Sequence, residues 1–163
     1  QSHSRRGDTC LSLMLHILLD SAPVGLLSNP ARTAEVLDVA NWAAACLAAG
    51  HSLYVPEVID YEVRRELIRA GKTTGLARLD RLKLQLEYLP LTTPAMLQAA
   101  ELWAQSRRSG KPTGDPNKID IDAILAAQAL TLAAPPAEVI VATPNARHLA
   151  QFVPAALWSE IAP

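Results

Sequence analysis

The sequence has 163 residues, a length that suits one domain with its own hydrophobic core. Half of the residues are hydrophobic, and the formal net charge is −1. A chain with so little net charge does not coat nucleic acid nonspecifically, so any contact with nucleic acid must come from a local basic patch. The two cysteines form neither a disulfide framework nor a metal-ligand spacing, which is typical of a reducing, cytoplasmic compartment.

The N-terminal region superficially resembles a secretory signal, because two arginines precede the apolar stretch 11–19. A histidine interrupts this stretch, Asp20 ends it, and it is too short to span a bilayer. We therefore predict no membrane segment. Met14 comes just before the first regular element. Residues 1–13 are expected to be a disordered extension, and residues 14–163 a single domain.

Short apolar runs alternate with helical patterns along the chain, and proline or glycine marks many of the boundaries. The expected elements, in chain order, are a strand at 15–19, a helical turn at 23–27, a helix at 32–49, a strand at 52–55, helices at 56–70 and 74–86, a strand at 87–89, helices at 94–108 and 119–132, a strand at 139–142, a helix at 145–151 and a small edge strand within 152–161. This alternation indicates an α/β fold, with a parallel sheet of about four to five strands and helices on both faces.

Acidic and polar side chains follow several of these strands. Asp20 directly follows the first strand, and Glu62 lies early in the helix after the second. Asp120 and Asp122 are expected to begin the helix after a polar loop, and Asn145 follows the fourth strand. Because the carboxyl ends of parallel strands meet at one edge, three or four of these carboxylates are expected to share a cleft. Such a cluster repels itself unless it holds a cation.

The type of ligand indicates which cation the expected carboxylate cluster would hold. Oxygen-only ligands favour a hard ion, so we predict Mg²⁺ or Mn²⁺. This chemistry suits phosphodiester hydrolysis, in which the ion activates water and shields the charge that builds on the phosphate. A second ion about 3.5–4 Å away would stabilise the leaving oxygen.

Each of these residues also has a structural alternative. Asp20 and Asn145 suit helix caps, and Glu62 suits a solvated position beside an apolar stripe. Asp120 and Asp122 would stabilise a helix N-terminus by about 0.3–1 kcal/mol. The prediction of a metal site therefore rests on the coincidence of polar residues at successive strand ends, and on no single residue.

Four segments together resemble the PIN-domain family and, within it, the VapC-like toxins. Segment 17–23 is similar to the first strand and first acid of the family, and segment 56–67 to its strand–helix unit with a glutamate. Segment 121–129 is similar to the helix with an aspartate followed by small residues, and segment 141–149 to the last strand and fourth polar position. The four segments follow the family's order between about residues 14 and 161.

The resemblance implies a PIN-like three-layer α/β/α fold and a metal-dependent endoribonuclease that cleaves single-stranded RNA. It implies that Asp20, Glu62 and Asp122 bind Mg²⁺ or Mn²⁺ and are catalytic. Asn145, the fourth catalytic position, stands where many relatives have an aspartate, so a weaker second metal site is expected unless Asp120 supplies the missing charge. The resemblance also implies a toxin of a type II toxin–antitoxin pair, with a small antitoxin as partner and commonly a homodimer.

Basic residues near the predicted acids are candidates for RNA binding. Arg64 and Arg65 lie two and three residues after Glu62, and Arg108 and Lys111 precede the acidic loop. Contacts of this kind to phosphates position a strand without reading its sequence. The structural alternative for these residues is a solvated helix face. An apolar groove between helices 32–49 and 56–70 is a candidate antitoxin site.

Alternatives of other kinds remain open from the sequence. One is a PIN domain that binds RNA or protein without cutting, for which Asn145 is the support. Another is a phosphoaspartate protein, because receivers and some phosphatases also place an aspartate after the first strand. The phosphatase type requires a second aspartate two residues later, where Ala22 stands, and the lysine and further aspartate of a receiver are not found after the later strands. A nucleotide-binding domain would need a glycine-rich phosphate loop after Leu19, which the sequence does not have.

Overall fold

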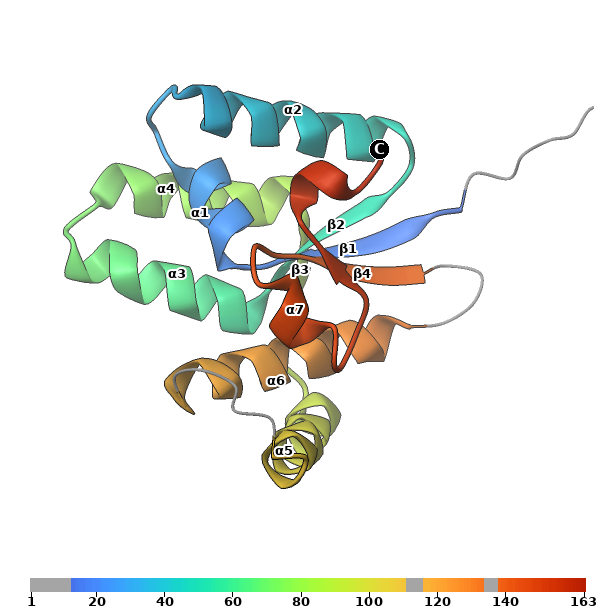
Figure 1. Ribbon diagram of the computed structural model, residues 1–163. Helices are drawn as coiled ribbons and strands as arrows, with labels where there is room; N and C mark the ends of the chain where they lie inside the picture. Colours follow the sequence, from blue (N-terminus) through green and yellow to red (C-terminus); the bar gives the residue numbers. More distant parts are fainter. Residues whose placement is uncertain (1–12, 111–115, 134–137) are drawn as a thin grey trace, which may run out of the picture.

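The computed structural model describes residues 13–110, 116–133 and 138–163 (Figure 1). The expected N-terminal extension therefore lies outside the described residues except for residue 13, and the RNA-binding candidate Lys111 also lies outside them. Among the helices in these ranges, none is long and apolar enough to cross a bilayer.

A parallel sheet forms the centre of the fold. Its strands, in spatial order, are β3 (Glu87–Leu89), β2 (Ser52–Pro56), β1 (Leu15–Leu19), β4 (Glu138–Ala142) and β5 (Ala155–Ala156). In the centre of the sheet, Ile17 of β1 is paired with Leu53 on one side and with Ile140 on the other. All neighbouring strands run parallel, so the predicted parallel sheet of four to five strands is confirmed.

The crossover helices cover both faces of this sheet, and α2 and α6 lie on opposite faces (Figure 1). The helices are α1 (Ser21–Ser28), α2 (Ala34–Ala48), α3 (Glu57–Arg69), α4 (Thr73–Gln85), α5 (Thr93–Arg108), α6 (Pro116–Leu132) and α7 (Ala146–Leu149), and a 3₁₀ turn follows at Trp158–Glu160. This is the three-layer α/β/α arrangement that the sequence predicts.

The core lies between the sheet and these two helical layers. Ile17, Leu18 and Leu19 of β1 are fully buried, as expected for a central strand that is covered on both faces. Near the chain end, Trp42 of α2 packs against Trp158 with ring centroids 5.7 Å apart. The indole of Trp42 also donates a hydrogen bond of 2.9 Å to the Ile161 carbonyl. These contacts anchor the C-terminal segment to α2.

One helix boundary differs from the prediction in a way that affects the site. Helix α6 begins at Pro116, three residues before the expected start at 119. Proline suits the first turn of a helix because its φ is already helical and no N–H partner is needed there. Asp120 and Asp122 therefore lie inside the helix, and the expectation that they begin it is wrong.

Candidate functional site

Asp20 lies where β1 ends and α1 begins. It is 6 % exposed, and its Oδ1 accepts a hydrogen bond of 2.7 Å from the backbone N–H of Ser21 as the N-cap of α1. Its own N–H donates to the Ala142 carbonyl at 3.0 Å, which ties it to the end of β4. The predicted helix-cap role is confirmed, and it leaves the second carboxylate oxygen available for another interaction.

Thr143 provides that interaction. Its buried hydroxyl donates a hydrogen bond of 2.6 Å to Oδ2 of Asp20 and accepts one of 3.0 Å from the N–H of Asn145. The backbone N–H of Thr143 donates to the Ala156 carbonyl at 2.9 Å, so the hydroxyl is held from the β5 side as well. The sequence patterns assign no role to Thr143.

The carboxylate of Asp20 thus accepts hydrogen bonds from two neutral donors. Among the described residues, none of the Lys and Arg ion pairs involves Asp20. A buried carboxylate without a cationic partner favours the approach of a positive ion, because the low-dielectric surroundings strengthen the attraction.

Glu62 approaches this end of the sheet from the next layer. Helix α1 packs against α3, and Glu62 of α3 lines the same cavity as Ser21, which follows Asp20 in the chain. The cavity has a volume of about 410 Å³ and Gly25 forms part of its wall. Glu62 is half-buried there. The structure therefore places Glu62 and the start of α1 on one shared hollow.

The acids of α6 approach from the other side of α3, against which α6 packs. Asp122 is half-buried and Asp120 is exposed. Asn145 is exposed at the N-cap of α7, but its side chain makes no capping hydrogen bond. The expected capping role of the Asn145 side chain is wrong, and the amide faces solvent.

The carboxylates that the structure describes do not form a tight cluster of three. Within the described ranges, no group of three His, Cys, Asp or Glu side chains lies close enough to hold one metal ion. The expectation that three carboxylates share one cleft is therefore not met by these side chains. The donors still suit Mg²⁺ or Mn²⁺, because they are all oxygens and Mg²⁺ usually takes one or two carboxylates directly and keeps water for its other positions.

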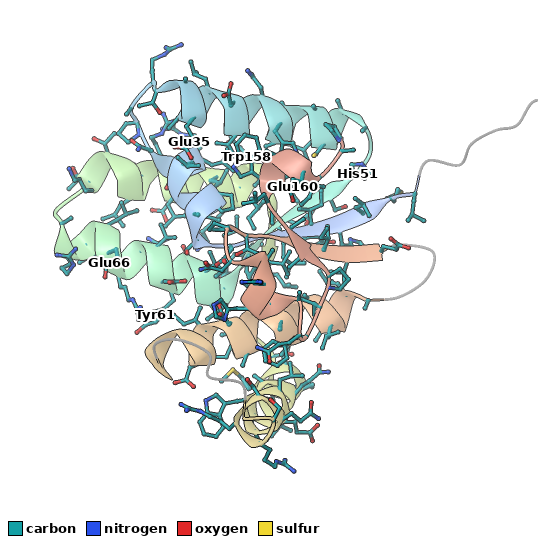
Figure 2. All side chains as sticks on the ribbon, in the orientation of Figure 1. Glu35, His51, Tyr61, Glu66, Trp158 and Glu160 are labelled. Carbon is teal, nitrogen blue, oxygen red and sulfur yellow. The ribbon has the colours of Figure 1, made fainter. Side chains whose placement is uncertain are left out.

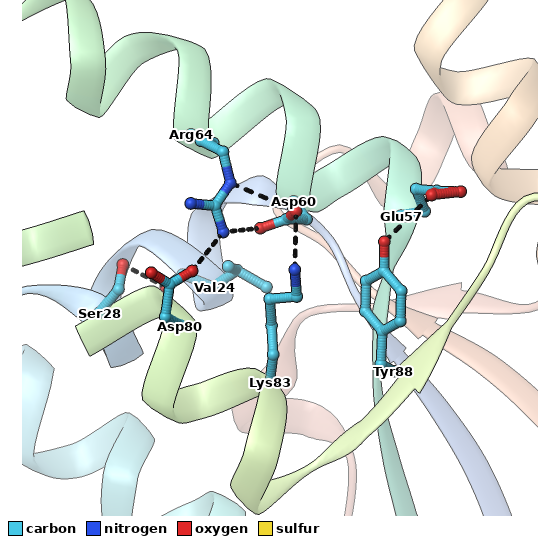
Figure 3. Close-up of polar contacts among 8 residues, drawn as sticks. All are labelled: Val24, Ser28, Glu57, Asp60, Arg64, Asp80, Lys83 and Tyr88. Atoms are coloured by element: carbon cyan, nitrogen blue, oxygen red, sulfur yellow. Dashed lines mark hydrogen bonds and ion pairs between the residues drawn. The ribbon is translucent and has the colours of Figure 1, made fainter. Parts of the chain in front are cut away.

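The four RNA-binding candidates differ in their surroundings. Arg64 donates hydrogen bonds to Asp60 at 2.9 Å and to Asp80 at 2.7 Å (Figure 3). The hydrogen bond to Asp60 is the main cause that raises the pKa of Arg64. Lys83 joins the same network with a 3.2 Å contact to Asp60. Arg64 thus links α3 to α4, and a phosphate would have to compete with two carboxylates for it.

Arg65, in contrast, is exposed, and its guanidinium lies 5.2 Å from the ring centroid of Tyr61. Arg108 is exposed in the last turn of α5. In the described part of the structure, neither Arg65 nor Arg108 forms an ion pair with a carboxylate, and both lie on the surface where a phosphate can reach them.

A second polar link, which the sequence did not reveal, fixes the end of β3 to the start of α3. Glu57 accepts a hydrogen bond of 3.1 Å from the Tyr88 hydroxyl (Figure 3). It accepts another of 2.9 Å from the N–H of Leu91. Burial, followed by the hydrogen bond to Glu57, raises the pKa of Tyr88 to about 12.

One cavity of the structure is a further candidate for a partner site. A cavity of about 450 Å³ lies between the end of α1, the end of α3 and the start of α4, and is lined by residues that include Gly25, Leu67, Lys72 and Gly75. Its lining includes no residue of α2. This cavity involves α3 but not α2, so it differs from the groove expected between helices 32–49 and 56–70, which stays a prediction.

With this geometry in place, comparisons with known proteins identify the family. Residues 30–149 match the PIN domain. The chain therefore belongs to the PIN-domain family, which is a family of nucleases. This assignment removes the support for a phosphoaspartate protein or a nucleotide-binding domain. No curated protein matches the sequence.

Solved structures with the same fold include three toxin–antitoxin complexes. VapBC2 from Rickettsia felis, bound to a DNA fragment from its promoter, matches with a TM-score of 0.64 and 14 % identity, over 88 % of this chain and 99 % of that one. VapBC-1 from nontypeable Haemophilus influenzae matches with a TM-score of 0.60 and 15 % identity, over 90 % and 100 %. DNA-bound VapBC from Salmonella typhimurium matches with a TM-score of 0.55 and 17 % identity, over 89 % and 99 %.

Proposed function

We propose that this chain is a metal-dependent endoribonuclease that cleaves single-stranded RNA, and that it is the toxin of a type II toxin–antitoxin pair. The observation that carries the proposal is the buried carboxylate of Asp20, which hydrogen bonds from Ser21 and Thr143 orient at the carboxyl end of the sheet. Membership of the PIN-domain family supports nuclease activity at this edge. The fold shared with the VapBC complexes supports the toxin role.

In this proposal each acid has a distinct role at Mg²⁺ or Mn²⁺. Asp20 binds the ion directly, because its position is fixed by two hydrogen bonds. Glu62 and Asp122, which come from α3 and α6, bind it directly or through water. When bound, the ion supplies Lewis-acid activation of water and shields the charge that develops on the phosphate. Asn145 and Asp120 are the outer members, and Asn145 adds no charge.

The proposed partners follow from the fold and the surface. VapBC complexes contain an antitoxin, so we expect a small antitoxin here as well, and the cavity between α1, α3 and α4 is a candidate for its contact. We further expect a homodimer in the cytoplasm. Arg65 and Arg108 are the surface cations best placed to meet RNA phosphates, with Arg64 and Lys111 as further candidates.

A nuclease assay with a matched control tests the proposal. Purified wild type is incubated with single-stranded RNA and Mn²⁺, beside Asp20→Asn, Asp122→Asn and Asp38→Asn. Asparagine at position 20 keeps an oxygen for the α1 cap, so the fold should survive. Asp38 is an exposed acid of α2 and serves as the control. We expect cleavage by wild type and by Asp38→Asn, abolished by EDTA, and at least about 100-fold slower cleavage by the two site variants.

A second candidate function is a PIN domain that binds RNA or protein without cutting. Two observations favour it: Asn145 carries no charge, and the described residues form no three-ligand metal group. The same assay decides between the candidates. RNA binding by the wild type without Mn²⁺-dependent cleavage would favour the binding module and contradict the nuclease.

A further inference from the structure

Two aromatic side chains are exposed on the described surface, and the other aromatic residues of the chain are buried or half-buried. They are Tyr61 of α3, which is 58 % exposed, and Trp103 of α5, which is 38 % exposed. Exposure of a large aromatic ring to water is unfavourable, because its apolar area gains little from solvation. Single exposed apolar residues are normal on a protein surface, so the argument rests on the surroundings of these two rings.

Each ring has an arginine of its own as neighbour, at the same spacing along the helix. The guanidinium of Arg65 lies 5.2 Å from the Tyr61 ring centroid, and that of Arg107 lies 5.2 Å from the Trp103 ring centroid. In each case the arginine is four residues after the aromatic residue, so the pair lies on one face of its helix. Each pair offers a flat ring beside a positive charge.

Each ring lines a hollow that is bordered by the same two residues of α6. Tyr61 and Arg65 line a hollow of about 840 Å³ together with Asp120 and Ile124. Trp103 lines a second hollow of about 410 Å³, and its wall also includes Asp120 and Ile124. Figure 2 shows Tyr61 on the side of α3 nearest to α6. Asp120, two residues before Asp122, is thus common to both hollows.

We propose that Tyr61–Arg65 and Trp103–Arg107 are two base-stacking platforms that hold a single-stranded nucleic acid across the acidic site. The proposal rests on the proposed nuclease function and adds residues that position the strand. A base can stack on each ring whatever its identity, because every base has a π face. The neighbouring arginine meets the phosphate or extends the stacking plane.

The charge distribution agrees with this arrangement. The chain has a net charge of −1, so a strand is not attracted by a strong overall field. Binding must then depend on local contacts, and stacking is a contact that needs no large positive surface. A strand that stacks on both rings would pass Asp120, which borders both hollows.

The test measures binding in the absence of cleavage. The full chain carries Asp20→Asn, and binding of a fluorescent ten-nucleotide poly(U) RNA is followed by anisotropy in EDTA. In this background Tyr61→Leu and Trp103→Leu each remove one aromatic ring. Tyr61→Phe and Trp103→Phe keep an aromatic ring at the same position. Leu97→Ala is the control, because it alters an exposed apolar residue of α5 outside the second hollow. DNA of the same sequence and an abasic strand complete the series.

We expect each leucine variant to bind the RNA roughly 5- to 150-fold more weakly. The phenylalanine variants and Leu97→Ala should stay within about twofold of the parent. The abasic strand should bind weakly and equally to the parent and the leucine variants. Quenching of tryptophan fluorescence by RNA should be smaller in Trp103→Leu. Comparison of RNA with DNA shows which sugar the platforms accept.

The outcomes separate this inference from the nuclease function. Equal binding by the parent and both leucine variants overturns the platforms, even when the wild type cleaves RNA. The platforms are also overturned if the leucine variants lose stability in urea but bind RNA as the parent does. They are overturned as well if the parent binds a protein partner but no strand. Failure of the wild type to cleave, with ring-dependent binding intact, instead contradicts the nuclease function alone.

Discussion

Thr143 Oγ1 and Asp20 Oδ2 lie 2.6 Å apart, and the hydrogen bond between them joins the ends of β4 and β1. The two residues are 123 positions apart in the chain, so the bond exists only because β1 and β4 are paired. Asp20 is held by a neighbouring strand as well as by the helix that it caps. The orientation of its carboxylate therefore depends on Thr143.

Thr143→Val tests this dependence. Valine keeps the shape of threonine but removes the hydroxyl, so both Asp20 Oδ2 and the Asn145 N–H lose a partner. We expect the free energy of unfolding to fall by about 1–3 kcal/mol and RNA cleavage to fall at least about tenfold. Thr143→Ser should restore both. Urea denaturation and the Mn²⁺ assay measure the two effects, and wild-type cleavage by the valine variant would contradict the positioning role.

Asp60→Asn tests the ion-pair network between α3 and α4. The side chain of Asp60 is 11 % exposed and pairs with both Arg64 and Lys83. Loss of its charge removes the ion pair with the half-buried Lys83 and leaves Arg64 paired with Asp80, so we expect a loss of about 1–3 kcal/mol in the free energy of unfolding. Asp80→Asn is the matched control, because that side chain is 63 % exposed, and it should cost less than about 1 kcal/mol. Equal losses in urea denaturation would show that burial does not matter here.

Tyr88 gives a prediction about pH. Its pKa is raised in the folded state from the model-compound value of 10.0 to about 12, first by burial and then by Glu57. The stabilisation that depends on the protonated phenol is therefore complete below about pH 10 and is lost as the pH rises through about 12. The difference in ultraviolet absorbance between wild type and Tyr88→Phe, measured as a function of pH, isolates the ionisation of this phenol. We expect it to ionise near pH 12, and ionisation near pH 10 would contradict the link to Glu57.

Asn145→Asp tests the role of the missing charge. Asn145 is exposed and its side chain makes no capping bond, so the aspartate should fold as the wild type does. If Asn145 weakens a second metal site, the added carboxylate should raise the number or the affinity of bound Mn²⁺ ions, which calorimetry measures. Two tight and independent sites already present in the wild type would contradict the idea.

Much of the fold could be predicted from local sequence patterns. The boundaries of β1 and β3 agree with the prediction, because apolar runs between polar turns define them. The start of α6 was placed too late, since a stretch rich in glycine and proline is typical of a loop although Pro116 suits a first helical turn. The cavity between α1, α3 and α4 could not be predicted, because sequence does not show which helices are neighbours.

The site could be predicted only in part, for a physical reason. Asp20 follows β1, and Glu62 lies in the helix after β2. Only the order and direction of the strands in the sheet show that both belong to the same edge. The role of Thr143 and the network around Asp60 depend on contacts between segments distant in sequence, which no local pattern contains. For the same reason, the sequence did not predict that the described carboxylates form no three-ligand group.

The central claim is that acids on different elements hold one divalent ion, and Mn²⁺ binding tests it most directly. Mn²⁺ is titrated into wild type, Asp20→Asn, Glu62→Gln and Asp122→Asn and followed by electron paramagnetic resonance, with Asp38→Asn as the control. We predict a bound ion in wild type and control, and at least about tenfold weaker binding in each of the three site variants. Equal affinity in all five proteins, or no bound ion in the wild type, would contradict the account.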